Sequence, residues 1–199
     1  MAALGLYVIT GPMFAGKTTE LLRILNKYRI AGYRTLLVKP SIDKRYSLRE
    51  VVSHDGIRME ALAIEPTLSD LLRVSEVLYS HDVIGFDEFQ FFEYRRGLVD
   101  FILRLSDEKT VYVASLNLDF RGEPWEIVKE LLPYADEIQT LYAVCTYVDP
   151  ETGRKCGKPA SRTQRLIDGK PAPYESPRIL VGGKESYEAR CRKHHFVVK

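Results

Sequence analysis

Residues 11–18 read Gly-Pro-Met-Phe-Ala-Gly-Lys-Thr, and this octapeptide limits the possible folds of the chain most strongly. It matches the pattern G-x-x-x-x-G-K-[ST], whose glycines let backbone N–H groups turn inward around phosphate groups. A nearly continuous apolar run, residues 4–10, precedes the octapeptide, and leucines recur at helical spacing through residues 18–30. A buried strand, a glycine loop and a helix in this order predict a domain that binds a nucleotide.

The residue types of this loop suit the phosphates of ATP. A helix that begins near Lys17 directs its positive dipole end toward them. Lys17 is expected to span the β- and γ-phosphates, and the Thr18 hydroxyl is expected to ligate Mg²⁺. We therefore predict ATP and Mg²⁺ as cofactors. The residues predicted to bind them in this loop are Gly11, Pro12, Met13, Phe14, Ala15, Gly16, Lys17 and Thr18.

Apolar runs and helical periodicities alternate through the rest of the first 144 residues. The expected elements are strands at 35–38, 83–86, 110–115 and 138–144 and helices at 68–78, 96–105 and 124–132. This alternation predicts an α/β fold of the RecA-like P-loop class, with a parallel sheet flanked by helices. The polar segment 41–57 is expected to be a long, mobile loop. Because helical periodicity disappears after Cys145, we predict a nucleotide-binding domain at 1–144 and a second domain at 145–199.

Two acidic residues, Asp87 and Glu88, directly follow the apolar strand at 83–86. P-loop enzymes need a carboxylate at the end of a neighbouring strand to hold Mg²⁺, and Asp87 fits this role through a coordinated water. Glu88 is placed to take a proton from an incoming hydroxyl group, or to activate water as in many ATPases. In the alternative interpretation Asp87 caps a helix and Glu88 is solvated.

The cysteines cluster in the C-terminal part of the chain: Cys145, Cys156 and Cys191. An odd number of cysteines argues against a disulfide framework. Cys191 and His194 have the spacing of a zinc knuckle, and a turn predicted at 149–153 could bring the other two thiols together. Three thiolates and one imidazole would form a closed, structural Zn²⁺ site. His195 is the rival fourth ligand, and three free cysteines are the alternative.

Charge is distributed unevenly, because residues 144–199 carry a net +6 and residues 1–143 a net −4. The basic segment predicts a polyanion nearby, which a nucleotide satisfies as well as RNA does; a solvated basic surface is equally compatible. No run of 18 apolar residues and no basic N-terminal region is present, so neither a membrane span nor a signal peptide is expected. We therefore predict a cytoplasmic protein with no membrane or nucleic-acid partner.

Motifs in a fixed order make residues 4–196 similar to the cytosolic-type (type II) thymidine kinases. They are the loop at 11–18 with the helix start at 19–22, the segments 43–46 and 53–56, the strand end at 87–92, the segment 116–125, and residues 181–183 with Tyr187 before Cys191. The resemblance implies transfer of the γ-phosphate of ATP to the 5′-hydroxyl of thymidine. It also implies a zinc-binding domain with a lasso loop, a homotetramer, and inhibition by thymidine triphosphate.

The resemblance further implies roles for single residues. Glu88 would be the general base on the thymidine 5′-hydroxyl. Arg45 would meet the phosphates, and Asp43 and Gln90 would lie near the nucleotide. The nucleoside pocket would comprise Met13 and Leu116 against the methyl group, Phe120 near the base, backbone groups of Arg178, Ile179, Leu180, Val181 and Gly182 at the thymine edge, and Tyr187 closing the site.

Three features depart from the family's pattern. Asn117 stands where aspartate is expected, Trp125 where phenylalanine is expected, and ten residues separate Cys145 from Cys156 in place of a short knuckle. Two other functions fit parts of the sequence. One is a motor or switch ATPase in which Glu88 activates water, and the other is a non-catalytic zinc-ribbon protein that binds nucleic acid. Few aromatic residues and no base-stacking motif in the basic segment argue against the second.

Overall fold

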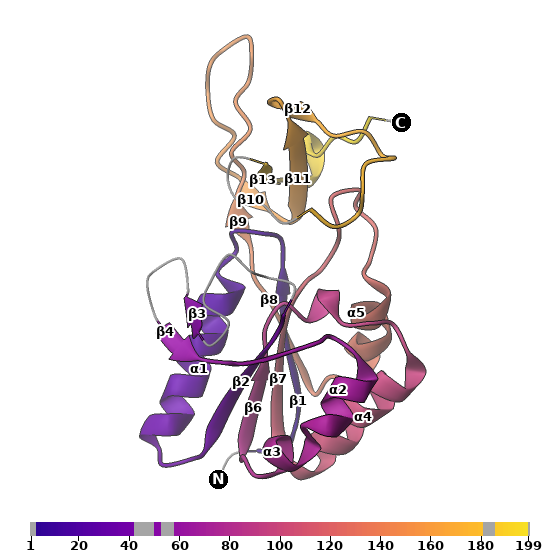
Figure 1. Cartoon of the computed structure of the whole chain (residues 1–199). Coiled ribbons are helices and arrows are strands. Elements are labelled where there is room, and N and C mark those ends of the chain that lie inside the picture. Colours follow the sequence, from indigo (N-terminus) through magenta and orange to yellow (C-terminus); the bar gives the residue numbers. More distant parts are fainter. Residues whose placement is uncertain (1–2, 42–49, 53–57, 181–185, 199) are drawn as a thin grey trace. The chain divides into compact units, whose positions relative to one another are not determined.

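The computed structural model describes residues 3–41, 50–52, 58–180 and 186–198 (Figure 1). The chain divides into two compact units. Unit 1 comprises Met1–Thr10, Lys17–Ser115 and Glu126–Gln139, and unit 2 comprises Gly11–Gly16, Leu116–Trp125 and Thr140–Lys199. Unit 2 is therefore assembled from three segments far apart in the sequence. The predicted domains, 1–144 and 145–199, remain a prediction.

A six-stranded sheet in the order β5-β2-β6-β7-β1-β8 forms the centre of unit 1. Its strands are β1 (Gly5–Gly11), β2 (Thr35–Pro40), β5 (Leu62–Ile64), β6 (Val83–Phe86), β7 (Thr110–Leu116) and β8 (Glu137–Thr140). The pairs β2–β5, β2–β6 and β6–β7 are parallel. All four residues of β6 are buried, as a strand covered on both faces requires.

Helices lie on both sides of this sheet, with α1 on one side and α2, α4 and α5 on the other (Figure 1). The helices are α1 (Lys17–Ile30), α2 (Leu68–Arg73), α3 (Ser75–Tyr79), α4 (Arg96–Glu108) and α5 (Glu126–Leu131), with 3₁₀ helices η1 (Phe89–Phe91) and η2 (Leu132–Tyr134). Helix α1 lies directly on β6, because a Cβ atom added at Gly85 would be 2.8 Å from Leu25 Cδ1. This architecture confirms the predicted α/β fold.

Three predicted elements differ from the structure. The helix expected at 68–78 is two helices that meet at Val74, whose φ of −98° and ψ of 9° are not helical. The strand expected at 138–144 is two strands, β8 and β9 (Ala143–Val144), which belong to different sheets. Inside the expected loop at 41–57, β3 (Glu50–Val52) pairs antiparallel with β4 (Arg58–Glu60); residues 42–49 and 53–57 lie outside the described part.

Unit 2 contains short antiparallel strands and no α-helix among its described residues. Its further elements are β10 (Pro159–Ala160), which pairs with β9, β11 (Arg162–Ile167), β12 (Lys170–Pro171), β13 (Tyr187–Arg190) and the 3₁₀ helix η3 (Arg192–His194). Strand β11 lies between β12 and β13. Between β9 and β10 the chain forms a long hairpin, closed by a bridge between Val148 and Lys155 (Figure 1).

The described helices are all too short or too polar to cross a bilayer. The longest, α1, has 14 residues, whereas a membrane span needs roughly 20.

Candidate functional site

In unit 1 the end of β6 lies beside the first turn of α1. The Thr18 hydroxyl donates to the Asp87 carboxylate at 3.0 and 3.2 Å. Burial and the neighbouring Glu88 raise the pKa of Asp87 to about 7, although the Thr18 hydrogen bond and the charge of Lys17 oppose this. Burial likewise lowers the pKa of Lys17, against the effect of both carboxylates. A bound divalent cation would stabilise the charged form of Asp87 at this position, so the residues present fit Mg²⁺.

Glu88 has an unusual backbone conformation, with φ of 52° and ψ of 39°. A non-glycine residue in this left-handed region is strained by roughly 1–3 kcal/mol, and such residues are concentrated at functional sites. The Gln90 amide donates to the Glu88 carboxylate, and the Ser115 hydroxyl donates to the Gln90 carbonyl at 3.1 Å. The side chain of Glu88 is thus oriented by a buried chain of hydrogen bonds that starts in β7.

The glycine-rich part of the loop, Gly11–Gly16, belongs to unit 2. Gly11 has a φ of 154°, and a Cβ atom there would lie 2.4 Å from the Leu141 carbonyl oxygen, so only glycine fits. The Met13 N–H donates to Thr163 Oγ1 at 3.0 Å. Sequence analysis missed Thr163, because nothing local connects it to a loop 150 residues earlier.

Phe14 and Ala15 of the same loop pack against a buried cluster in unit 2. The cluster consists of Ala143, Cys145, Ala160, Ala189 and Cys191. The loop is therefore supported by the same residues that surround two of the thiols.

The four predicted zinc ligands converge in unit 2. The nearest ligand atoms of Cys145, Cys156, Cys191 and His194 all lie within 4.8 Å of one another. His194 Nδ1 is 3.8 Å from the Cys145 sulfur and 3.5 Å from the Cys191 sulfur, which is 3.9 Å from the Cys156 sulfur. Ligands about 2.0–2.3 Å from one tetrahedral zinc ion are separated by roughly 3.5–3.8 Å, whereas disulfide sulfurs lie about 2.05 Å apart. The donor set and its spacing therefore fit zinc.

The hairpin between β9 and β10 bridges the long gap between the first two cysteines. The Cys156 N–H donates to the Tyr147 carbonyl at 2.8 Å, and the Gly157 N–H donates to the Cys145 carbonyl at 3.1 Å. The Tyr147 ring stacks on the His194 ring at 4.2 Å and so covers one side of the cluster. The rival ligand, His195, lies elsewhere, with its Nε2 atom 2.8 Å from the Phe120 carbonyl.

Arg178 ties the start of the predicted lasso to the segment Leu116–Trp125. Its guanidinium pairs with the buried Asp119 at 2.9 Å, donates to the Pro124 carbonyl at 2.6 Å and lies 4.3 Å from the centre of the Trp125 ring. A cation interacts more strongly with the ring of tryptophan than with that of phenylalanine. The contact with Arg178 therefore gives a physical reason for tryptophan at position 125, where phenylalanine was expected. Asp119 belongs to the motif at 116–125 but had no predicted role of its own, and it also accepts the Arg121 and Glu123 N–H groups.

The other predicted pocket residues differ in exposure. Leu116, Phe120 and Tyr187 are buried, whereas Ile179 and Leu180 are about half exposed. The Asn117 amide donates to the Ser161 carbonyl at 3.1 Å, and its buried Oδ1 has no partner among the described residues. Four predicted site residues lie outside the described part of the chain: Asp43, Arg45, Val181 and Gly182.

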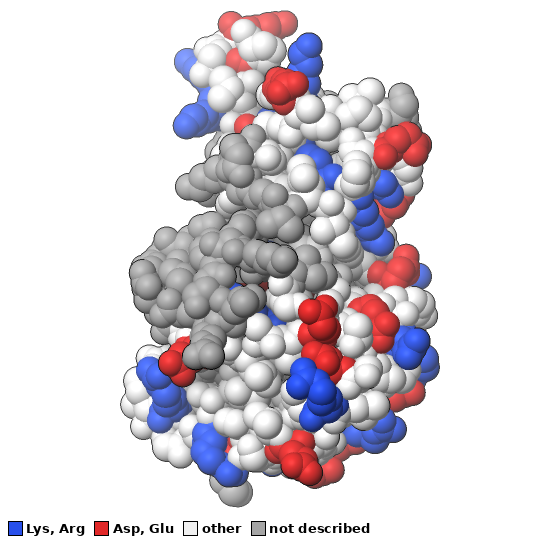
Figure 2. All heavy atoms as spheres, in the orientation of Figure 1, with Lys and Arg blue, Asp and Glu red and all other residues white. Residues whose placement is uncertain are grey.

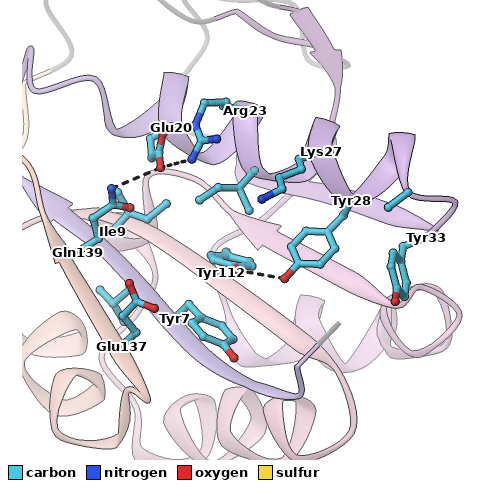
Figure 3. Close-up of a pocket in the computed structure, with 13 residues that line it drawn as sticks. Tyr7, Ile9, Glu20, Arg23, Lys27, Tyr28, Tyr33, Tyr112, Glu137 and Gln139 are labelled. Atoms are coloured by element: carbon cyan, nitrogen blue, oxygen red, sulfur yellow. Dashed lines mark hydrogen bonds and ion pairs between the residues drawn. The ribbon is translucent and has the colours of Figure 1, made fainter. Parts of the chain in front are cut away.

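Unit 1 has a hollow of about 640 Å³ between α1 and strands β1, β7 and β8 (Figure 3). Tyr7 stacks on Tyr112 at 4.9 Å, and the hydroxyls of Tyr112 and Tyr28 are 3.4 Å apart. None of the predicted site residues lines this hollow.

The sequence model of the thymidine kinase family matches residues 4–195. A thymidine kinase of Thermococcus kodakarensis is 52% identical over 195 residues, which are 96% of this chain and 94% of that protein. Thymidine kinases of Pyrobaculum aerophilum and Coprothermobacter proteolyticus are each 47% identical over 96% of this chain and cover 98% and 90% of their own length. The flagellar accessory protein FlaH of Methanocaldococcus jannaschii aligns over 74% of each chain at 15% identity, and its TM-score of 0.45 is too low to add to the assignment.

Proposed function

This chain belongs to the thymidine kinase family, and from that membership we propose that it transfers the γ-phosphate of ATP to the 5′-hydroxyl of thymidine, giving dTMP and ADP. The observation that carries the proposal is near-full-length identity of 47–52% to three thymidine kinases. The juxtaposition of Thr18, Asp87 and Glu88 supplies the groups that the reaction requires.

The phosphates would be held by the backbone N–H groups of the loop and by Lys17. Thr18 directly, and Asp87 through a water, would hold Mg²⁺, which neutralises charge on the β- and γ-phosphates when bound. Glu88 accepts the proton of the 5′-hydroxyl as that oxygen attacks the γ-phosphorus in line, and ADP leaves. Gln90 keeps the Glu88 carboxylate directed at the hydroxyl.

We assign recognition of the nucleoside to unit 2. Met13 and Leu116 would line the methyl pocket, Phe120 would lie near the base, and Tyr187 would close the site. Backbone groups of residues 178–182 would bind the thymine edge, Arg45 would meet the phosphates, and Asp43 would lie near the nucleotide. A site that pairs backbone groups with one pyrimidine pattern rejects analogues that leave those groups unpaired.

Zinc is proposed as a structural ion held by Cys145, Cys156, Cys191 and His194. The spacing of the four ligand atoms supports the assignment to zinc. Four protein ligands complete a tetrahedral coordination and leave no position for a substrate or water, so the ion is assigned a structural role.

The family resemblance supports three further proposals: a homotetramer, inhibition by thymidine triphosphate and a cytoplasmic location. Light scattering of the purified protein would measure the first directly. A basic surface that binds nucleic acid is the weaker alternative, because acidic and basic residues are interspersed on the face drawn in Figure 2.

The decisive experiment is ADP release by the purified protein with and without thymidine. We expect release that depends on thymidine, and a Glu88→Gln variant that loses roughly 10²–10⁴-fold in kcat while retaining ATP binding. ADP release that is indifferent to thymidine would instead identify an ATPase. Binding of single-stranded DNA without any ADP release would identify the zinc-ribbon alternative.

A further inference from the structure

Among the described residues, Arg165 is the largest fully buried side chain, with 2% of its surface exposed. It lies in β11 directly opposite Tyr187 of β13, so the two side chains share one face of the small sheet of unit 2. An arginine keeps its charge at any accessible pH, and burying that charge is costly unless its N–H groups are satisfied. A buried arginine in this position therefore needs a specific explanation.

Four hydrogen bonds join the Arg165 guanidinium to its surroundings. Two reach the Tyr187 hydroxyl, at 3.0 and 2.6 Å, one reaches the Pro177 carbonyl, and one reaches the Arg178 carbonyl at 2.9 Å. The Tyr187 hydroxyl in turn donates to the Leu180 carbonyl at 2.7 Å. Residues 177–180, called the lasso base here, are thus fixed through three of their carbonyl groups.

The charge of Arg165 is balanced by aromatic rings. Its guanidinium carbon lies 4.0 Å from the centre of the Phe120 ring and 5.2 Å from that of Tyr187. Among the described residues no carboxylate lies within ion-pair distance of it. The planar guanidinium of Arg165 therefore makes two kinds of contact. The N–H groups at its edge bind backbone carbonyls, and its face packs on the Phe120 ring.

We propose that Arg165 is a positioning residue for nucleoside selection, which fixes the lasso base and the Phe120 ring in the arrangement that accepts the pyrimidine. The inference rests on the proposed function, in which backbone groups of this loop and Phe120 meet the base. The Tyr187 hydroxyl links Arg165 to the lasso base, because it accepts hydrogen bonds from Arg165 and donates one to the Leu180 carbonyl. Lysine cannot replace Arg165, because a single ammonium group cannot span two carbonyls and a hydroxyl in one plane.

Steady-state kinetics of Arg165→Lys and Tyr187→Phe tests the proposal, with Arg154→Lys at the exposed hairpin as the matched control. We expect KM for thymidine to rise about tenfold or more in both variants, while kcat and KM for ATP change less than about threefold. We also expect the preference for thymidine over deoxycytidine, measured as a ratio of kcat/KM, to fall. Equal losses for both substrates, or an unchanged KM for thymidine in both variants, would overturn the proposal.

Limited proteolysis with trypsin tests the same inference without any turnover. We expect Arg165→Lys and Tyr187→Phe to accelerate cleavage after Arg178, while cleavage in the hairpin after Arg154 and Lys155 keeps its wild-type rate. Unchanged cleavage after Arg178 would refute the positioning role. A wild-type protein that does not phosphorylate thymidine would remove the proposed function, whereas faster cleavage would still establish that Arg165 holds the lasso base.

Discussion

Glu88 and Gln90 are joined by a side-chain hydrogen bond just after the end of β6. Glu88 has a strained, left-handed backbone, and the buried Gln90 donates a hydrogen bond to its carboxylate. The functional importance of Asp87 and Glu88 was predicted from their position directly after an apolar strand. The orienting role of Gln90 was not predicted, because Ser115, which donates to it, lies 25 residues away in the sequence.

Gln90→Ala should lower kcat about tenfold and leave KM for ATP nearly unchanged, because it removes the hydrogen bond that orients the Glu88 carboxylate but leaves Lys17 and Thr18 in place. Initial-rate measurements at saturating ATP and thymidine check this. Gln139→Ala is the control, since Gln139 hydrogen-bonds Glu20 in the hollow between α1 and β8, which none of the predicted site residues lines. A rate equal to that of the wild type would show that Glu88 is held by other contacts.

Residues that join distant segments escaped the sequence analysis. Thr163 and Arg165 lie in no motif, and Asp119 lies in the motif at 116–125 without a predicted role. Each contacts a residue between 12 and 150 positions away. Local patterns predict a residue's role only when its partner is a sequence neighbour. The predicted roles of Met13, Leu116 and Phe120 remain predictions.

Among the elements, the buried strand β6 was predicted with its observed limits, because four apolar residues lie between turn-forming ones. The segment at 138–144 was predicted as one strand because apolar residues continue through it. Its two halves belong to different sheets, β8 in the main sheet and β9 beside β10. Sequence hydrophobicity does not reveal such a change of sheet.

Helix α1 and strand β6 are held in contact at a glycine. Gly85→Val should lower the free energy of unfolding by about 1–3 kcal/mol, because its methyl groups would occupy the space of Leu21 and Leu25. Since α1 begins with Lys17 and Thr18, we also expect KM for ATP to rise. Gly85→Ala should give a smaller effect on both quantities. Chemical denaturation and kinetics of the two variants check the order; a valine variant as stable as the wild type would contradict it.

At the scale of the whole molecule, we expect the cysteine cluster to influence the phosphate loop at 11–18 as well as the C-terminal residues around it. Cys191→Ser should abolish zinc binding and weaken ATP binding about tenfold or more, because Phe14 and Ala15 of the phosphate loop rest on the cluster. Zinc analysis and calorimetric titration with ATP measure the two effects. Lys155→Ala in the hairpin is the control and should change neither. ATP affinity that survives complete loss of zinc would show that the loop holds its conformation unaided.

The three-segment construction of unit 2 also has a consequence for protein engineering. A chimera that takes only residues 145–199 from a relative would pair a foreign Thr163 position and a foreign cluster with the native Met13, Phe14 and Ala15. Recombination that respects these contacts must transplant residues 11–16 and 116–125 together with the C-terminal part. The segments proposed to bind phosphate and to select a nucleoside contact one another within unit 2, so an exchange of one segment requires the exchange of the others.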